Sequence, residues 1–155
     1  MIAVLDNDPS FLSLMHELLT EEGYVPLLWD ADAQPDPHAL LRQVQPALVI
    51  LDLWIERRDD GWELLKRLWA DVETTHIPAV IVTGEPAVLP VRADLLRAMH
   101  CEVVRKPFDL HDLLTTIATV LGSSPARWKR GARGAVSSMS DPRVVDGFTA
   151  VLVAN

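Results

Sequence analysis

Six polar residues of this 155-residue chain are of types that handle phosphoryl groups, and they lie directly after short apolar runs. They are Asp6, Asn7, Asp8, Asp52, Thr83 and Lys106. Clustered carboxylates repel one another, so a hard cation such as Mg²⁺ is their natural neutraliser. An ammonium and a hydroxyl can hold the oxygens of a tetrahedral anion. Together these groups are the parts needed to transfer a phosphoryl group onto a carboxylate.

The elements that would position these residues alternate regularly along the chain. Runs typical of strands cover residues 2–5, 25–29, 47–51, 79–82 and 102–105, of which the last is the most polar. Between and after them, apolar residues recur with helical spacing at about 11–19, 37–45, 62–69, 90–99 and 110–121. This alternation predicts right-handed βαβ units. The fold class is therefore α/β, a doubly wound five-stranded parallel sheet with helices on both faces.

The composition of each run predicts its place in the sheet. The runs 2–5, 47–51 and 79–82 are continuously apolar and should be central. Pro26 cannot donate a ladder hydrogen bond, so its strand should lie at one edge, and the charged run 102–105 suits the other edge. The predicted strand order is 2-1-3-4-5. In such sheets ligands bind beyond the carboxyl ends of the strands, where the six polar residues would meet.

Capping and periodicity add local expectations. Asp36 and Asp109 are predicted helix N-caps, as is one of Asp59 and Asp60, and Asp8 suits either a cap or a metal ligand. Gly23 and Gly122 should follow helix ends. The helical spacing predicts that the apolar side chains of each stripe face the core, and these include Leu14, Trp62, Trp69 and Leu95.

Length and composition limit the class of protein. With 49% hydrophobic residues, the chain can bury the core of one ordinary domain. It lacks an apolar run of roughly 18 residues, so we expect no membrane span, and no signal-peptide pattern is visible at its start. A single cysteine, Cys101, excludes an internal disulfide and fits a reducing, cytoplasmic location.

Charge divides the chain in two. Residues 1–122 contain 9 basic and 20 acidic residues, whereas residues 123–155 contain 5 basic and 2 acidic ones. We therefore expect one domain over 1–122, followed by a basic C-terminal tail over 123–155 in which a short strand could form near 148–153. The acidic domain is a poor match for the phosphate backbone of a nucleic acid.

Five motifs, in a fixed order, resemble those of the response-regulator receiver domain of two-component signalling. They are the sequences LDNDP at 5–9, LDL at 51–53, DGWELL at 60–65, VTG at 82–84 and KPF at 106–108. The resemblance covers residues 1–121 and implies the flavodoxin-like fold. It also implies a phosphoprotein that acts in phosphorelay signal transduction through an aspartyl phosphate.

The resemblance assigns a role to each candidate residue. Asp52 would be the phosphoacceptor, taking its phosphoryl group from a sensor histidine kinase or a phosphotransfer protein. Thr83 and Lys106 would hold the phosphoryl oxygens. The implied Mg²⁺ ligands are Asp6, Asn7, Asp52 and the backbone carbonyl of Trp54, with Asp8 as a further candidate.

The resemblance also implies the output. Such a domain is not an enzyme in the usual sense, because it catalyses only its own phosphorylation and dephosphorylation. The acyl phosphate would switch a surface on the fourth helix, fifth strand and fifth helix, which binds a downstream protein. The tail is too short for the usual DNA-binding output domain, so we expect no direct DNA-binding domain. A homodimer is a further expectation.

Three features depart from the family pattern. Asn7 is neutral where the direct metal ligand is usually acidic, residues 54–60 lack the usual Met-Pro and are one residue longer, and Val103 replaces the aromatic switch residue. These departures motivate an alternative, a degenerate receiver that binds its partner without phosphorylation. A less favoured alternative is a haloacid-dehalogenase-like phosphatase with Asp6 as nucleophile, in which Asp52 would have no role.

Overall fold

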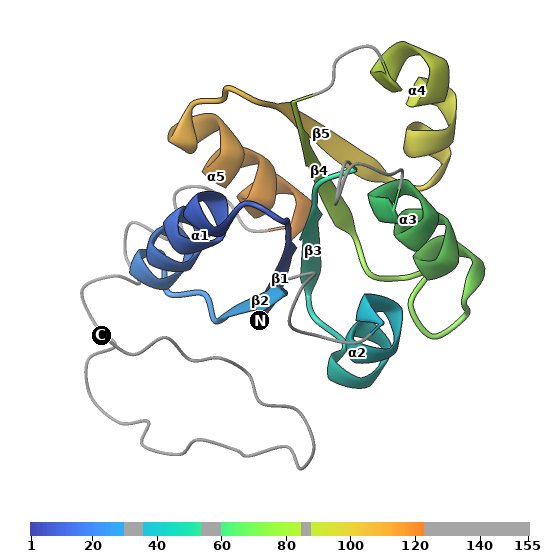
Figure 1. Cartoon of the computed structure of the whole chain (residues 1–155), viewed down its shortest axis with the longest axis horizontal. Helices are drawn as coiled ribbons and strands as arrows, with labels where there is room; N and C mark the ends of the chain where they lie inside the picture. The colour runs from blue at the N-terminus through green and yellow to red at the C-terminus, as the bar shows by residue number, and fades with distance from the viewer. Residues whose placement is uncertain (30–35, 54–59, 85–87, 123–155) are drawn as a thin grey trace.

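The computed structural model describes residues 1–29, 36–53, 60–84 and 88–122 (Figure 1). Within these ranges five strands alternate with five helices, as predicted. The elements are β1 (Ile2–Leu5), α1 (Pro9–Glu21), β2 (Pro26–Trp29), α2 (Pro37–Val44), β3 (Leu48–Leu51), α3 (Asp60–Ala70), β4 (Ala79–Thr83), α4 (Val88–Ala98), β5 (Cys101–Arg105) and α5 (Leu110–Val120). The predicted tail and its short strand lie outside the described residues.

All five strands are parallel, in the order β2-β1-β3-β4-β5, which confirms the predicted topology. The three central strands, β1, β3 and β4, are buried along their whole length. The edge strand β2 begins at Pro26, where the missing N–H costs no ladder bond. At the other edge, β5 exposes three of its five residues.

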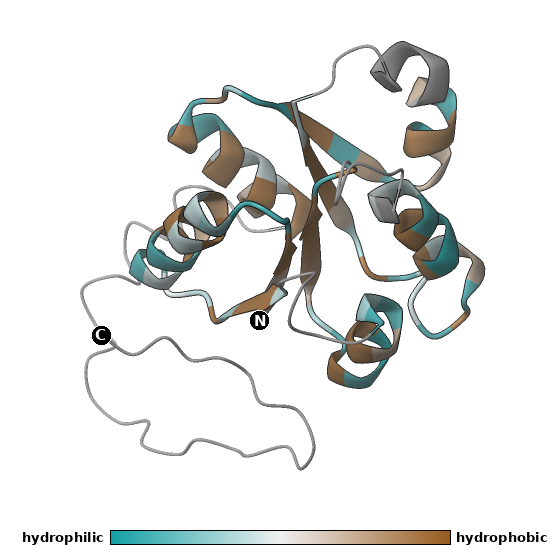
Figure 2. Ribbon diagram, in the orientation of Figure 1, coloured by the Kyte–Doolittle hydropathy of each residue, from teal (hydrophilic) through white to brown (hydrophobic). Residues whose placement is uncertain are grey.

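Helices cover both faces of the sheet, with α1 and α5 on one side and α2, α3 and α4 on the other (Figure 1). Alternate strand residues serve the two sides: Ile2 and Val4 pack with α1 and α5, whereas Ala3 and Leu5 pack with α2 and α3. The apolar strands therefore lie at the centre, and hydrophilic residues lie mainly on the helices (Figure 2). In the described part of the chain, no helix combines the length and apolar character needed to cross a bilayer.

Capping fixes the helix starts near the site. The side chains of Asp8, Asp36 and Asp109 accept backbone N–H hydrogen bonds from the residues two positions on, at 2.9, 3.1 and 2.7 Å. Gly23 and Gly122 follow α1 and α5 with φ angles of +79° and +64°. The caps at Asp36 and Asp109 and the terminal glycines were thus predicted correctly. Asp60 is the first residue of α3 and Asp59 lies outside the described residues, so the predicted cap of this helix stays a prediction.

Three side chains that were predicted to face the core do not. Trp62 is buried, but Trp69 in the last turn of α3 is 46% exposed, and Leu14 and Leu95 are exposed as well. Periodicity locates the apolar stripe of a helix but not its width. When a helix packs on a sheet, only the side chains at the centre of its apolar stripe are covered. Side chains at the border of the stripe stay in contact with water.

Gly61, in the first turn of α3, is required by the close approach of this helix to the end of β3. A Cβ atom at this position would lie 2.0 Å from the carbonyl oxygen of Asp52 and 2.8 Å from the Cα atom of Leu53. Both contacts are with backbone, which cannot move aside cheaply. Gly84, which follows β4, differs because an added Cβ would meet nothing nearer than the Cβ atom of Lys106, at 3.9 Å.

We expect Gly61→Ala to lower the free energy of unfolding by about 1–3 kcal/mol or more, because the added methyl overpacks the backbone beside Asp52. Gly84→Ala is the matched control and should change stability by less than about 1 kcal/mol. Urea denaturation followed by circular dichroism measures both values. Equal stabilities for the two variants would contradict the packing argument.

Candidate functional site

Four of the candidate residues lie where parallel strands end. Asp6 directly follows β1, Asp52 follows β3, Thr83 is the last residue of β4 and Lys106 follows β5. The sheet brings them together at the carboxyl ends of its strands, although Asp6 and Lys106 are 100 positions apart in the sequence. The backbone joins them too, because the N–H of Lys106 donates to the carbonyl oxygen of Thr83 at 2.8 Å, and the N–H of Asp52 donates to that of Leu5 at 3.1 Å.

The ammonium of Lys106 lies between two buried carboxylates. Its Nζ is 2.7 Å from Oδ2 of Asp6 and 3.0 Å from Oδ2 of Asp52. Asp6 and Asp52 are 1% and 8% exposed, and the Lys106 side chain is 26% exposed. The other oxygen of Asp6 accepts the backbone N–H of Asp8 at 2.9 Å. When all three side chains are charged, the site holds one more negative than positive charge.

The pKa values reflect the cost of this arrangement. Burial raises the pKa of the Asp6 carboxyl above its ordinary value, although the hydrogen bonds from Lys106 and from the Asp8 N–H lower it. Burial lowers the pKa of Lys106, but its hydrogen bonds to Asp6 and Asp52 outweigh that effect and the net direction is upward. The ammonium therefore stays charged, whereas ionised Asp6 is incompletely compensated.

An aromatic ring completes the surroundings of Lys106. Its Nζ lies 4.3 Å from the ring centroid of Phe11, a cation–π contact. Phe11 meets Phe108 edge to face, with centroids 6.2 Å apart and planes at 84°. Sequence reasoning placed Phe11 on the core-facing stripe of its helix and missed this contact. Its position in the first turn after the acidic motif was the available signal.

The two carboxylates fit a hard cation. Their Oδ2 atoms lie close enough to share one cation, the Lys106 ammonium, and the remaining negative charge of the site is what a divalent ion would neutralise. Among the described residues, no third acidic, histidine or cysteine side chain joins them to form a metal-binding group. Within the part of the chain that the structure describes, further ligands would be neutral oxygens.

The other predicted metal ligands differ in their placement. Asn7 lies exposed beside Asp6 and offers a neutral amide oxygen. Asp8 is also exposed, and its Oδ1 accepts the N–H of Ser10 as the cap of α1. This carboxylate therefore has a structural task already. Trp54, predicted to contribute its carbonyl, lies outside the described residues.

Comparison with known proteins gives one family. The sequence model described as "Response regulator receiver domain" matches residues 2–118. The curated protein PilH of Pseudomonas aeruginosa is 29% identical over 123 residues, which are 77% of this chain and 96% of that protein. Two longer curated relatives are matched over only 32% and 48% of their own length.

Solved structures agree with this result. The receiver domain of NtrX from Brucella abortus is 25% identical, with a TM-score of 0.64 over 80% of this chain and all of that domain. A receiver domain of a sensor histidine kinase from Pseudomonas aeruginosa is 19% identical, with a TM-score of 0.65 over 79% of this chain and 97% of that one. That structure is described as having a magnesium ion coordinated in its active-site cleft. At this identity the likeness concerns the fold.

We expect Lys106→Met to lower the free energy of unfolding by about 2–4 kcal/mol at neutral pH, because it leaves two buried carboxylates without their ammonium. The loss should shrink on acidification. Lys106 lowers the pKa of Asp6, so its removal raises that pKa further in the folded variant. The folded variant therefore binds a proton more readily than the unfolded chain, and its free energy of unfolding recovers as the pH falls through the folded pKa. Urea denaturation from neutral pH to about pH 5 tests both statements.

Lys66→Met is the matched control. Lys66 is an exposed lysine of α3 that pairs with Glu63 at 2.5 Å, and such a surface pair contributes under about 1 kcal/mol. Its removal should cost little at any pH. Equal losses in the two variants would show that the site does not depend on Lys106 as its counter-ion.

Proposed function

The chain belongs to the response regulator receiver domain family, and from this premise we propose that it accepts a phosphoryl group on Asp52 in two-component signalling. The observation that carries the proposal is the contact of one ammonium with both Asp6 and Asp52 at the carboxyl edge of the sheet. A carboxylate held beside a fixed cation is suited to becoming an acyl phosphate, since the cation can follow the charge onto the new group.

The proposed transfer is a displacement at phosphorus. A carboxylate oxygen of Asp52 attacks the phosphoryl group of a phosphohistidine on a sensor histidine kinase or a phosphotransfer protein. An O–P bond forms and the N–P bond breaks, and its electron pair returns to the imidazole nitrogen, which then takes up a proton from water. Asp52 is the nucleophile, and the chain is both substrate and catalyst of its own modification.

Lys106 and Thr83 are the proposed holders of the phosphoryl oxygens. Asp6 and the ring of Phe11 keep the ammonium of Lys106 at the site while its contact with Asp52 passes to a phosphoryl oxygen. The hydroxyl of Thr83, at the end of the neighbouring strand, would donate a hydrogen bond to another. Both residues bind charge that develops during transfer and neither needs to gain or lose a proton.

Mg²⁺ is the proposed cofactor, and the related kinase receiver described with a coordinated magnesium ion supports it. The residues that would hold it are Asp6, Asn7, Asp52 and the backbone carbonyl of Trp54. When bound, the ion neutralises the phosphoryl oxygens as the carboxylate approaches. The neutral side chain of Asn7 weakens the site relative to an acidic one, and the capping role of Asp8 limits its use as a replacement.

The proposed output is a change on the α4–β5–α5 surface that alters binding to a downstream protein. Thr83 and Arg105 are partners in the β4–β5 register, and Lys106 is tied to the backbone of Thr83. A movement of Thr83 toward the phosphoryl group is therefore passed directly to β5. With Val103 in the middle of this strand, the change cannot be the rotation of an aromatic ring.

One second candidate has a specific observation in its favour. Asn7 is neutral and exposed, and the Asp8 carboxylate is engaged as a helix cap, so the metal site is weaker than its two acids alone suggest. A degenerate receiver that binds its partner without phosphorylation would tolerate such a site. The intact ion pair at Asp52 supports the phosphoacceptor instead, because a binding module has no need to bury it.

The test is intact-protein mass spectrometry after incubation with Mg²⁺ and acetyl phosphate. We expect the mass of one phosphoryl group to be added, and Asp52→Asn to abolish the adduct because the nucleophile is lost. Asp94→Asn is the matched control, since this aspartate of α4 is almost fully exposed and pairs with Arg97. It should be phosphorylated like the unchanged protein.

The opposite results point to the second candidate. If neither acetyl phosphate nor a phosphorylated kinase adds mass, the phosphoacceptor proposal fails. Titration with Mg²⁺ and beryllium fluoride, followed by tryptophan emission, then tests the metal site independently. An unchanged emission would favour the degenerate receiver.

A further inference from the structure

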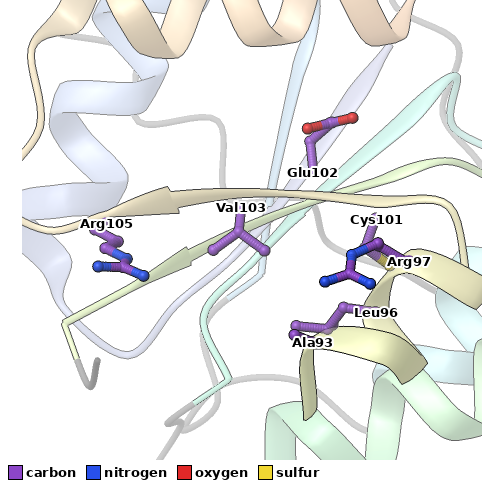
Figure 3. A pocket seen from close by; sticks show the side chains of 7 residues that line it. All are labelled: Ala93, Leu96, Arg97, Cys101, Glu102, Val103 and Arg105. Carbon is purple, nitrogen blue, oxygen red and sulfur yellow. The ribbon is translucent and has the colours of Figure 1, made fainter. Parts of the chain in front are cut away.

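An open groove lies between α4 and β5, with a volume of about 360 Å³ (Figure 3). One wall is formed by residues of α4, namely Ala93, Leu96 and Arg97. The other is formed by alternate residues of β5, namely Cys101, Val103 and Arg105. Glu102 also borders the groove, but its side chain points to the opposite side of the strand (Figure 3). The groove therefore lies between the last turns of a helix and one face of an edge strand.

The middle of the groove is apolar. Val103 is 36% exposed, and it faces α4, where Leu96 is buried in the core beneath. The exposed apolar side chain of Val103 lines the groove at the middle of β5. The volume is at the lower end of the range for ligand pockets. It suits one inserted side chain better than a whole cofactor.

The two ends of the groove are basic. Arg105 lies at one end and Arg97 at the other, and both are exposed (Figure 3). Among the charged residues that line the groove, Arg97 and Arg105 are basic and Glu102 is acidic. Arg97 pairs with Asp94 at 2.8 Å, but both side chains are largely in water. Such a pair is weak and can be exchanged for a partner's carboxylate.

The basic end at Arg105 is connected to the phosphoacceptor site. Arg105 directly precedes Lys106 and is the register partner of Thr83. The residue at this end of the groove is thus the sequence neighbour of the lysine whose ammonium contacts Asp6 and Asp52. A change in the position of Thr83 or Lys106 would therefore act on the backbone of Arg105, at one end of the groove.

We propose that this groove binds an acidic segment of a partner protein, which inserts one apolar side chain against Val103 and Leu96 and places flanking carboxylates on Arg97 and Arg105. The inference rests on the proposed function, because it names the chemistry of the partner at the output surface. Residues 123–155 contain 5 basic and 2 acidic residues, and this net positive charge disfavours the chain's own tail as the occupant. A nucleic acid is disfavoured by the acidic domain around the groove.

Cys101 is a built-in reporter of occupancy. It lines the groove and is the single cysteine of the chain, so a mass increase from a thiol reagent reports this place alone. Burial raises the pKa of its thiol to about 11, which keeps the reactive thiolate scarce near neutral pH. Alkylation should therefore be slow in the free protein, and slower when a segment covers the groove.

The experiment uses the full chain and two synthetic peptides. In the acidic peptide one leucine is flanked by aspartates and glutamates, and in the reversed peptide the flanks are lysines. Fluorescence anisotropy gives the dissociation constant, and the rate of alkylation of Cys101 by iodoacetamide locates the contact. We expect the acidic peptide to bind at least about tenfold more tightly and to be the one that slows alkylation.

Two variants separate the two halves of the interaction. The double variant Arg97→Gln, Arg105→Gln should weaken binding of the acidic peptide by about tenfold or more, because it removes both charges. Val103→Trp should weaken it comparably, because the indole fills the space for the leucine while both arginines remain. Lys66→Gln, on the exposed surface of α3, is the control and should bind like the unchanged protein.

Three results would contradict the proposed binding of an acidic segment. The proposal fails if the two peptides bind alike, if neither protects Cys101 up to about 1 mM peptide, or if Val103→Trp binds the acidic peptide unchanged. Protection that grows with protein concentration in the absence of peptide would assign the groove to a second copy of the chain instead. None of these measurements requires phosphorylation, so their failure is distinct from a missing adduct on Asp52.

Discussion

The structure depends on one arrangement, a lysine ammonium held between two buried carboxylates at the edge of a parallel sheet. Lys106 contacts Asp6 and Asp52 at 2.7 and 3.0 Å. The three residues come from the ends of β1, β3 and β5, so the contact exists only when the sheet has its full order. The same ammonium sits over the Phe11 ring, which links it to the first turn of α1 and to the packing of Phe108.

This arrangement lowers the stability of the fold but provides a charged site where a reaction can take place. Two buried acids share one cation, and the raised pKa of Asp6 shows that burial outweighs pairing at that carboxyl. Replacing such a cluster by apolar side chains often leaves a protein as stable or more so. Such a cluster suits a site where a carboxylate meets another charged group, and its excess negative charge fits the divalent cation that the proposed phosphoryl transfer would use. Gly61 serves the same end by letting α3 approach the backbone of Asp52.

The edge strand β5 joins the two proposals physically. Its last residue, Arg105, is the register partner of Thr83 and the neighbour of Lys106, while Val103 and Cys101 line the groove toward α4. An edge strand exposes one side, so it can hold a reactive residue at its end and a binding surface along its length. The face of β5 that lines the groove is therefore well placed to change when the site around Asp52 changes.

The sequence by itself determined the element order, the strand order and the convergence of the acids with Lys106, because these follow from apolar runs, Pro26 at an edge and the rule that parallel strands end together. It also determined the caps at Asp36 and Asp109, which are local. Tertiary structure alone decided the exposure of Trp69, the ring of Phe11 over Lys106 and the groove beside Val103. These depend on how far each helix reaches over the sheet, and periodicity carries no information about that distance.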